Sequence, residues 1–144
     1  IAGRFARNDH ELDDVCQESF IKAYWSLGKY RAQAPFEHGL SRIAVRACYD
    51  LLRRTRRERE SIALDGIERG VEDNVSPARA RELVEWAMNR LTAEERLVIT
   101  LLELDERTVR EITELTGWSE SNVKVRAFRA RQRLKEVLET SHER

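Results

Sequence analysis

Residues 108–131 read TVREITELTGWSESNVKVRAFRAR, and this stretch carries the clearest local structural signals in the chain. Thr108 and Glu111, three positions apart, predict a capping box at the start of a short helix. Gly117 follows that helix and suits a tight turn, because glycine adopts backbone conformations that strain other residues. Ser119 then predicts the N-cap of a second, longer helix. The sequence therefore predicts a helix-turn-helix.

The second of these helices has faces of different chemistry. Val123, Ala127 and Ala130 recur at helical spacing and predict its buried side. The other faces carry amide and guanidinium donors, which read base edges in a major groove, and cations, which meet phosphates. The candidate duplex-binding residues are Ser121, Asn122, Lys124, Val125, Arg126, Phe128, Arg129 and Arg131. A plain helical hairpin with an exposed basic face is the alternative interpretation.

The rest of the chain also has a helical pattern. Only 6 glycines and 2 prolines interrupt it, and no segment alternates between apolar and polar residues with a period of two. Thr92 and Glu95 predict a further capping box before an apolar helix. Other helices are expected over about 13–27, 36–59 and 77–90. The predicted fold class is all-α.

The expected helix over 13–27 combines a core face with an exposed apolar surface. Its buried side is predicted from four residues at helical spacing: Cys16, Phe20, Ala23 and Leu27. Ile21 and Trp25 lie off this stripe. Large apolar groups on an exposed face are typical of a protein interface, whereas a solvated face would explain only the charges nearby.

Residues 61–76 interrupt the helical pattern. The stretch is acidic and contains Gly66 and Gly70, a composition typical of a linker. A proline follows it, in a position that suits the first residue of the next helix. We therefore expect two small helical domains, residues 1–60 and 77–144, joined by this short acidic linker.

Charge is distributed unevenly along the chain. The totals balance, with 26 Lys or Arg against 26 Asp or Glu. However, residues 1–60 hold 12 basic against 9 acidic side chains, and residues 121–144 hold 7 against 3. The segment between them holds 7 against 14. Two basic regions around an acidic middle suit a nucleic-acid partner, although either one alone would also fit a solvated helix face.

Other functional classes receive little support. His10, His38 and His142, with Cys16 and Cys48, show no metal-ligand spacing, and no nucleophile–base pair or phosphate-binding glycine loop is apparent. We expect no enzyme activity, cofactor or metal. The two cysteines are expected to be reduced thiols in the cytoplasm. No apolar run approaches the ~20 residues that span a bilayer, and no signal peptide is expected.

Several motifs together resemble those of the extracytoplasmic-function (ECF) sigma factors of the sigma-70 family. Residues 13–24, DDVCQESFIKAY, resemble the family's polymerase-binding helix, which typically reads D-x-V-Q-E-x-F-x-x-A-[WY]. FEHGLSRIA at 36–44 and DLLRR at 50–54 resemble its promoter-melting and minus-ten segment. Residues 91–138 are similar to its minus-thirty-five domain, and NVKVRAFRAR at 122–131 matches closely. The resemblance covers nearly the whole chain.

The resemblance implies an alternative sigma factor that directs core RNA polymerase to particular promoters. A coiled coil of the largest polymerase subunit would then contact the first helix. The residues implied in that contact are Asp14, Gln17, Glu18, Ile21 and Trp25. The resemblance also implies an anti-sigma partner that covers the polymerase-binding surfaces of both domains.

The resemblance places the minus-ten strand on the loop and helix that follow. Cationic and aromatic side chains together suit an unstacked base, and a row of arginines suits the backbone. The implied residues are Lys29, Tyr30, Arg31, Arg42, Arg46, Arg53 and Arg54. Tyr30 would equally well close the small core of the first domain.

This chain departs from the family pattern in the minus-ten segment. Gly39 and Ser41 stand where the family has tryptophan and an aromatic residue, and Arg46 stands where many members have a base-reading asparagine. A glycine within a helix costs about 1 kcal/mol relative to alanine. The family has a longer helical stretch before the position of Asp13, so we expect most of the first helix to be missing here.

A helix-turn-helix regulator that binds operator DNA as a dimer is the alternative function. It would use the same C-terminal helices but would leave residues 13–54 without a role. A dimeric regulator footprints two half-sites about one helical turn apart, which distinguishes it from a polymerase subunit.

Overall fold

A computed structural model of the chain describes residues 1–33, 35–63 and 76–142, and every regular element in these ranges is helical. This confirms the all-α prediction. The α-helices are α1 (Asp9–Ser26), α2 (Phe36–Ala63), α3 (Pro77–Met88), α4 (Ala93–Ile99), α5 (Val109–Thr116) and α6 (Glu120–His142). Short 3₁₀ turns form η1 (Ala2–Arg4) and η2 (Leu27–Lys29), and a π-helical turn forms η3 (Thr100–Leu104).

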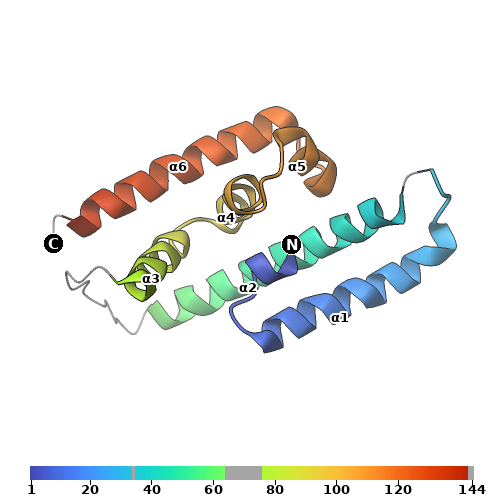
Figure 1. The fold of residues 1–144 in the computed structure, drawn as a ribbon, viewed down its shortest axis with the longest axis horizontal. Helices are drawn as coiled ribbons and strands as arrows, with labels where there is room; N and C mark the ends of the chain where they lie inside the picture. The colour runs from blue at the N-terminus through green and yellow to red at the C-terminus, as the bar shows by residue number, and fades with distance from the viewer. Residues whose placement is uncertain (34, 64–75, 143–144) are drawn as a thin grey trace.

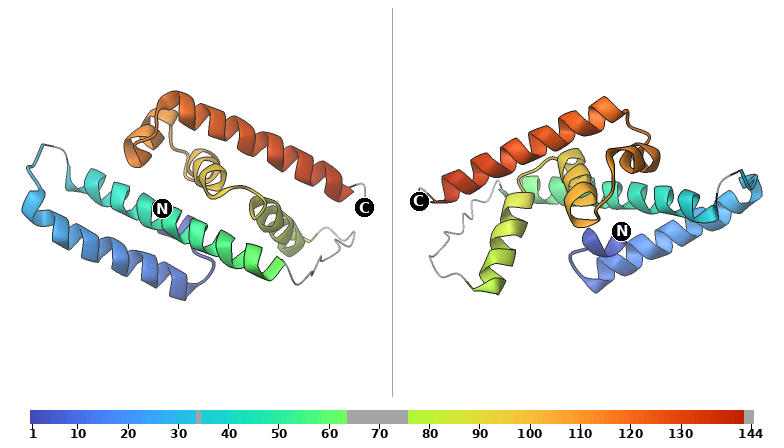
Figure 2. Two further views of the ribbon diagram at one scale, coloured as in Figure 1. Left: turned by 180° about the vertical axis from the view of Figure 1, so that it is seen from behind. Right: turned by 45° about the horizontal axis from the view of Figure 1, so that its top comes forward.

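The helices are arranged in layers (Figure 1). α1 and α2 form an antiparallel hairpin at one side of the molecule, and α6 lies at the opposite side. α4 and α5 lie between them and contact both α2 and α6. Figure 2 shows the same order from behind, with α3 at the end of the molecule that also holds the C-terminus. The fold therefore places α6 and α1 on opposite outer faces.

Side-chain caps determine where several helices begin. Asn8 accepts a hydrogen bond from the backbone N–H of Glu11 at 2.9 Å, so α1 starts four residues before the predicted position. The Thr92 hydroxyl and the Glu95 carboxylate form the predicted capping box reciprocally, at 3.2 and 3.0 Å. Ser76 caps α3, whose first residue is proline. Each such cap stabilises its helix by about 1 kcal/mol.

The helix-turn-helix forms as predicted, with one difference. Gly117 has φ +76° and its N–H donates to the Thr113 carbonyl at 2.9 Å, so the turn uses the left-handed conformation that glycine permits. The Thr108 hydroxyl accepts from the Glu111 N–H at 3.1 Å. In the predicted capping box the Glu111 carboxylate would accept from the backbone N–H of Thr108. In the structure this carboxylate instead lies 4.0 Å from the Arg107 guanidinium and pairs with it.

A hydrophobic core joins the two halves of the chain. Its buried residues in the first half are Phe5, Val15, Val45, Ala47, Cys48, Leu51 and Leu52. Those in the second half are Ala93, Leu97, Val98, Leu101, Ile112, Val123 and Ala127. The two predicted domains therefore pack against each other through apolar side chains of α2, α4 and α5.

The predicted linker overlaps the end of α2. That helix continues to Ala63, so the first three residues of the predicted linker are helical. Ser76, at the other end, is the N-cap of α3. Residues 64–75 lie outside the described ranges.

The buried face of α1 differs from the predicted one. Val15, Ser19 and Ala23 form the contact with α2, whereas Phe20 and Leu27 are exposed. The Ser19 hydroxyl donates to the Val15 carbonyl at 2.7 Å, so its polar group is satisfied although the side chain is buried. Small residues at this spacing let the two helices approach closely. Consequently the larger side chains of α1 turn outward.

Candidate functional site

The exposed side of α6 carries most of the predicted duplex-binding residues. Ser119 begins the helix by accepting from the Asn122 N–H at 3.2 Å. Val123, Ala127 and Ala130 are buried, as predicted. This orientation leaves the opposite side of the helix open to solvent. The exposed candidates are Ser121, Lys124, Val125, Phe128, Arg129 and Arg131.

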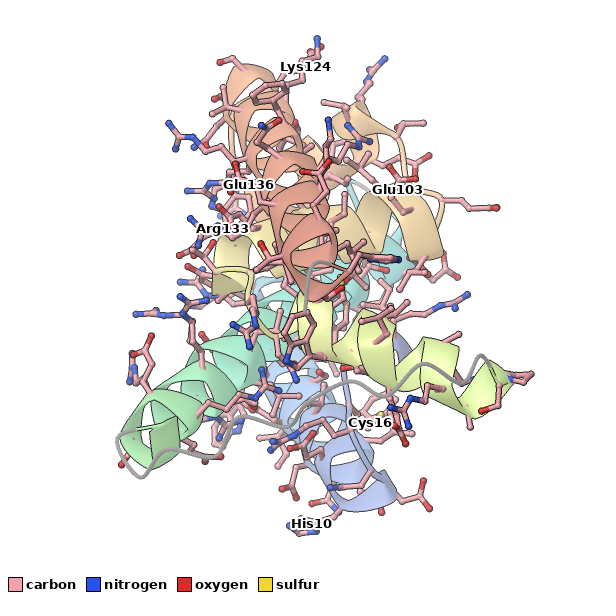
Figure 3. The ribbon with its side chains drawn as sticks, turned by 90° about the vertical axis from the view of Figure 1, so that its left-hand side faces the viewer. His10, Cys16, Glu103, Lys124, Arg133 and Glu136 are labelled. Carbon is pink, nitrogen blue, oxygen red and sulfur yellow. The ribbon has the colours of Figure 1, made fainter. Side chains whose placement is uncertain are left out.

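Among these exposed side chains, Phe128 provides apolar surface and Lys124 provides positive charge. Phe128 is 67% exposed, although phenylalanine is among the residue types most often buried. Lys124 pairs with Glu120 at 3.0 Å, and Figure 3 shows it pointing away from the body of the molecule. Such exposed pairs contribute little to stability, so the cation can exchange its partner for a phosphate at low cost.

Arg126 and Asn122 lie differently from the other six candidates. Both are half-buried on the flank of α6. The guanidinium carbon of Arg126 lies 3.8 Å from the centre of the Trp118 ring, and its Nη1 atom is buried without a hydrogen-bond partner in the structure. Arg126 therefore packs against the turn that precedes α6. The sequence did not separate it from the exposed arginines, because all lie on one polar helix.

The exposed side of α1 presents a cluster of aromatic and aliphatic groups. Ile21 and Trp25 are 57% and 75% exposed. Phe20, which was predicted on the buried stripe, and Tyr24, for which no role was predicted, are 63% and 72% exposed. These four residues are called the α1 aromatic surface. The signal that could have found the two additional residues is their i, i+4 spacing, which matches that of Ile21 and Trp25.

Polar groups border the α1 aromatic surface. Asp14 and Gln17 are exposed, and Glu18 is half-buried and forms an ion pair with Lys22 at 2.8 Å. An exposed apolar cluster of this kind, with carboxylates and an amide beside it, is typical of a protein interface.

The loop after α1 places an aromatic pair beside two cations. Tyr30 and Phe36 meet edge to face, with their ring centroids 5.8 Å apart. Lys29 and Arg31 flank Tyr30 and are exposed. Both rings are also exposed, so the pair offers aromatic surface outside the core.

Three of the four candidate arginines of α2 lie on one face of the helix. Arg42, Arg46 and Arg53 are exposed and separated by four and seven positions, so they form a row that we call the α2 basic stripe. Tyr49 lies within this row, and the Arg53 guanidinium carbon is 5.6 Å from its ring centre. Arg54 is also exposed but lies off the stripe by its position on the helix.

Gly39 stands where the family has tryptophan, and its surroundings show whether that missing side chain belongs to the core or to the surface. A Cβ atom at Gly39 would meet no atom within 4 Å, so a larger side chain there would project into open space. The missing aromatic group is therefore a surface group and leaves no gap in the core. Ser41, by contrast, is half-buried.

The described residues provide no membrane span or metal site. Within them, no helix combines the length and apolar character needed to cross a bilayer. Nor does any group of three or more His, Cys, Asp or Glu side chains there have a metal-binding arrangement. Cys16 is half-buried and Cys48 is buried, and both are free thiols.

Two protein-family models match the chain. The sigma-70 region 2 model matches residues 1–58, and the sigma-70 region 4 model matches residues 81–134. The first match contains α1 and most of α2, and the second contains α5 and the first two thirds of α6, which form the helix-turn-helix. The two models therefore account for the elements that carry all the surfaces described above.

Characterised relatives are similar along most of the chain. RNA polymerase sigma-H factor of Pseudomonas aeruginosa is 30% identical over 149 residues, covering 94% of this chain and 77% of that protein. ECF sigma-E of Escherichia coli K12 is 31% identical over 135 residues, covering 85% and 71%. ECF sigma factor SigM of Mycobacterium tuberculosis H37Rv is 29% identical over 133 residues, covering 92% and 67%.

A solved structure has a similar fold. It is the sigma factor RpoE in complex with the anti-sigma factor NepR from Bartonella quintana, with a TM-score of 0.61 and 21% sequence identity. The similarity covers 96% of this chain and 87% of that one. The two family models and the Escherichia coli relative show that this chain belongs to the ECF sigma factors of the sigma-70 family.

Proposed function

We propose that this chain is an alternative sigma factor that binds core RNA polymerase and directs promoter-specific initiation of transcription. The proposal rests on two exposed surfaces of one chain, the recognition helix α6 and the α1 aromatic surface, which lie on opposite sides of the molecule (Figure 1). A duplex-binding regulator needs only the first of these. A subunit that brings polymerase to DNA needs both.

The α1 aromatic surface is the proposed polymerase contact. Ile21 and Trp25 would supply the buried centre of the interface, and Asp14, Gln17 and Glu18 its polar rim. Phe20 and Tyr24 extend the apolar area beyond the residues that the sequence indicated. Tyr24 and Trp25 already meet edge to face, with centroids 6.2 Å apart, so part of the surface is ordered before binding.

The loop after α1 and the α2 basic stripe are the proposed minus-ten site. Tyr30 and Phe36 offer aromatic edges to an unstacked base, and Lys29 and Arg31 offer charge to its phosphates. The α2 basic stripe, with Arg54 beside it, continues this charge along the helix. A single strand could therefore run from the loop along α2.

The exposed side of α6 is the proposed minus-thirty-five site. Lys124 and Arg129 supply cations for base edges or phosphates, and Val125 and Phe128 supply apolar contact to thymine methyl groups. Ser121 and Arg131 lie on the same open side. α6 begins immediately after the glycine turn, so its N-terminal residues lead into the groove, as in other helix-turn-helix modules.

Control by an anti-sigma factor is part of the proposal. The solved sigma factor of similar fold is bound to its anti-sigma factor NepR. In this chain the α1 aromatic surface leaves large apolar groups in water, and a protein partner would cover them when polymerase does not. We place this activity in the cytoplasm, in two functional modules over residues 1–60 and 77–144 joined by 61–76.

A charge placed on the α1 aromatic surface tests the polymerase contact. Ile21→Glu and Trp25→Glu should each reduce capture of core RNA polymerase by at least tenfold, because an interface cannot easily bury an unpaired carboxylate. Ala78→Glu is the matched control, since it adds the same charge at an exposed site in the first turn of α3, where a carboxylate is compatible with the helix dipole. Capture equal to that of the control would place the interface elsewhere.

A further inference from the structure

Four residues from separate elements meet where α2 faces the C-terminal helices. The Tyr49 hydroxyl of α2 donates to the Glu94 carboxylate of α4 at 2.5 Å. The Tyr49 ring also meets the Trp118 ring edge to face, with centroids 5.8 Å apart and an interplanar angle of 87°. Arg126 of α6 packs on Trp118. We call Tyr49, Glu94, Trp118 and Arg126 the Tyr49 latch.

The protonation states of the Tyr49 latch favour its closure. Burial, and then the hydrogen bond to Glu94, raise the pKa of Tyr49, so its hydroxyl keeps its proton. Burial alone would raise the pKa of Glu94, but the Tyr49 hydrogen bond and the charges of Arg126 and Arg53 bring it below its usual value. A neutral phenol therefore donates to a carboxylate, which is a strong type of hydrogen bond.

Other contacts extend the same interface along α2. The Arg56 guanidinium donates to the Leu91 carbonyl, at the turn between α3 and α4. Leu52 of α2 belongs to the same buried core as Leu97 and Val98 of α4. The closed arrangement is thus stabilised by apolar burial along the helix and by polar contacts at two points.

The Tyr49 latch covers one of the proposed DNA sites and leaves the other open. Tyr49 lies on the α2 basic stripe between Arg46 and Arg53, so α4 and the turn before α6 stand over the middle of the proposed single-strand path. On α6, by contrast, Lys124 and Phe128 remain exposed. Closure should therefore impair minus-ten binding while leaving minus-thirty-five binding intact.

Promoter dimensions are inconsistent with both sites working in the closed arrangement. The minus-ten and minus-thirty-five elements lie about 25 base pairs apart, or roughly 85 Å at 3.4 Å per base pair. α6 has 23 residues and is therefore only about 35 Å long, and the turn at its start touches α2. One closed molecule cannot span the two elements.

We propose that the Tyr49 latch holds this sigma factor in a closed state that must open before the minus-ten strand can bind. Arg126 is then a positioning residue, which holds Trp118 against Tyr49, and the exposed residues of α6 make the duplex contacts. This inference rests on the proposed function, because it assigns the α2 basic stripe to a single strand.

A charge reversal at Glu94 tests the latch in the full chain. Glu94→Lys removes the acceptor of Tyr49 and places a cation near Arg53 and Arg126, so it should open the interface. Glu114→Lys is the matched control, since it makes the same change in charge on the exposed surface of α5. Small-angle scattering measures opening, and binding is measured with a single-stranded minus-ten oligonucleotide and a minus-thirty-five duplex.

We expect Glu94→Lys to have a larger radius of gyration than the control. It should also bind the single strand about tenfold more tightly, because the closed state loses one charge-assisted hydrogen bond. Duplex affinity should be equal in the two variants. Equal radii and equal single-strand affinities would overturn the proposal. A larger radius without single-strand binding in any variant would support the latch and refute the minus-ten role of α2.

A more conservative variant is available in case Glu94→Lys does not fold. If circular dichroism shows that Glu94→Lys loses helicity, Tyr49→Phe takes its place, because it removes only the hydroxyl that donates to Glu94. We expect the same direction of change in radius and in single-strand affinity. If Tyr49→Phe has the same radius of gyration and the same single-strand affinity as the wild type, the latch proposal is contradicted.

Discussion

Burial determines the chemistry of the two cysteines. Cys48 is fully buried in the core that joins α2 to the C-terminal helices, and this burial raises its pKa to about 12. The thiolate is the reactive form of cysteine, so Cys48 is protected both by its protonation and by its position. Cys16 is only half-buried on α1.

We expect iodoacetamide at pH 8 to modify Cys16 in the folded protein and to leave Cys48 unmodified. Mass spectrometry of tryptic peptides after timed labelling gives the rate at each thiol. In denaturant both should react at similar rates, which provides the control. Labelling of Cys48 as fast as Cys16 under native conditions would show that the shared core opens readily.

The helix-turn-helix shows what local sequence signals can predict at the scale of one element. Thr108, Gly117 and Ser119 determined its helix starts and its turn, because caps and left-handed glycines act over three or four residues. The orientation of α1 was predicted wrongly. Apolar periodicity favoured a stripe through Phe20, whereas the contact with α2 uses Val15 and Ser19, whose small size matters only when the neighbouring helix is present.

Two arginines of α6 should differ in their effect on duplex binding. Arg129→Ala should weaken binding to a minus-thirty-five duplex by about 1–3 kcal/mol, because Arg129 lies on the open side of the helix. Arg126→Ala should have a much smaller effect, because its guanidinium packs on Trp118. Fluorescence anisotropy on one labelled duplex compares them. An equal loss in both variants would return Arg126 to the recognition surface.

At the scale of the whole molecule, the shared core was the feature that sequence could not predict. Periodicity shows which side of a helix is apolar, but it does not show which distant helix covers it. Leu52 of α2 and Leu97 of α4 belong to one core, yet nothing in the sequence of either segment indicated that these helices pack together. The same holds for Tyr49 and Glu94, whose contact depends on how α2 and α4 meet.

Transcription in vitro tests most directly whether this chain gives polymerase its promoter specificity. A promoter library is transcribed by core RNA polymerase with and without the protein, and start sites are mapped. We predict start sites that appear only with the protein and share two spaced sequence elements. No new start sites, despite specific binding of the protein to duplex DNA, would contradict it and favour a helix-turn-helix regulator.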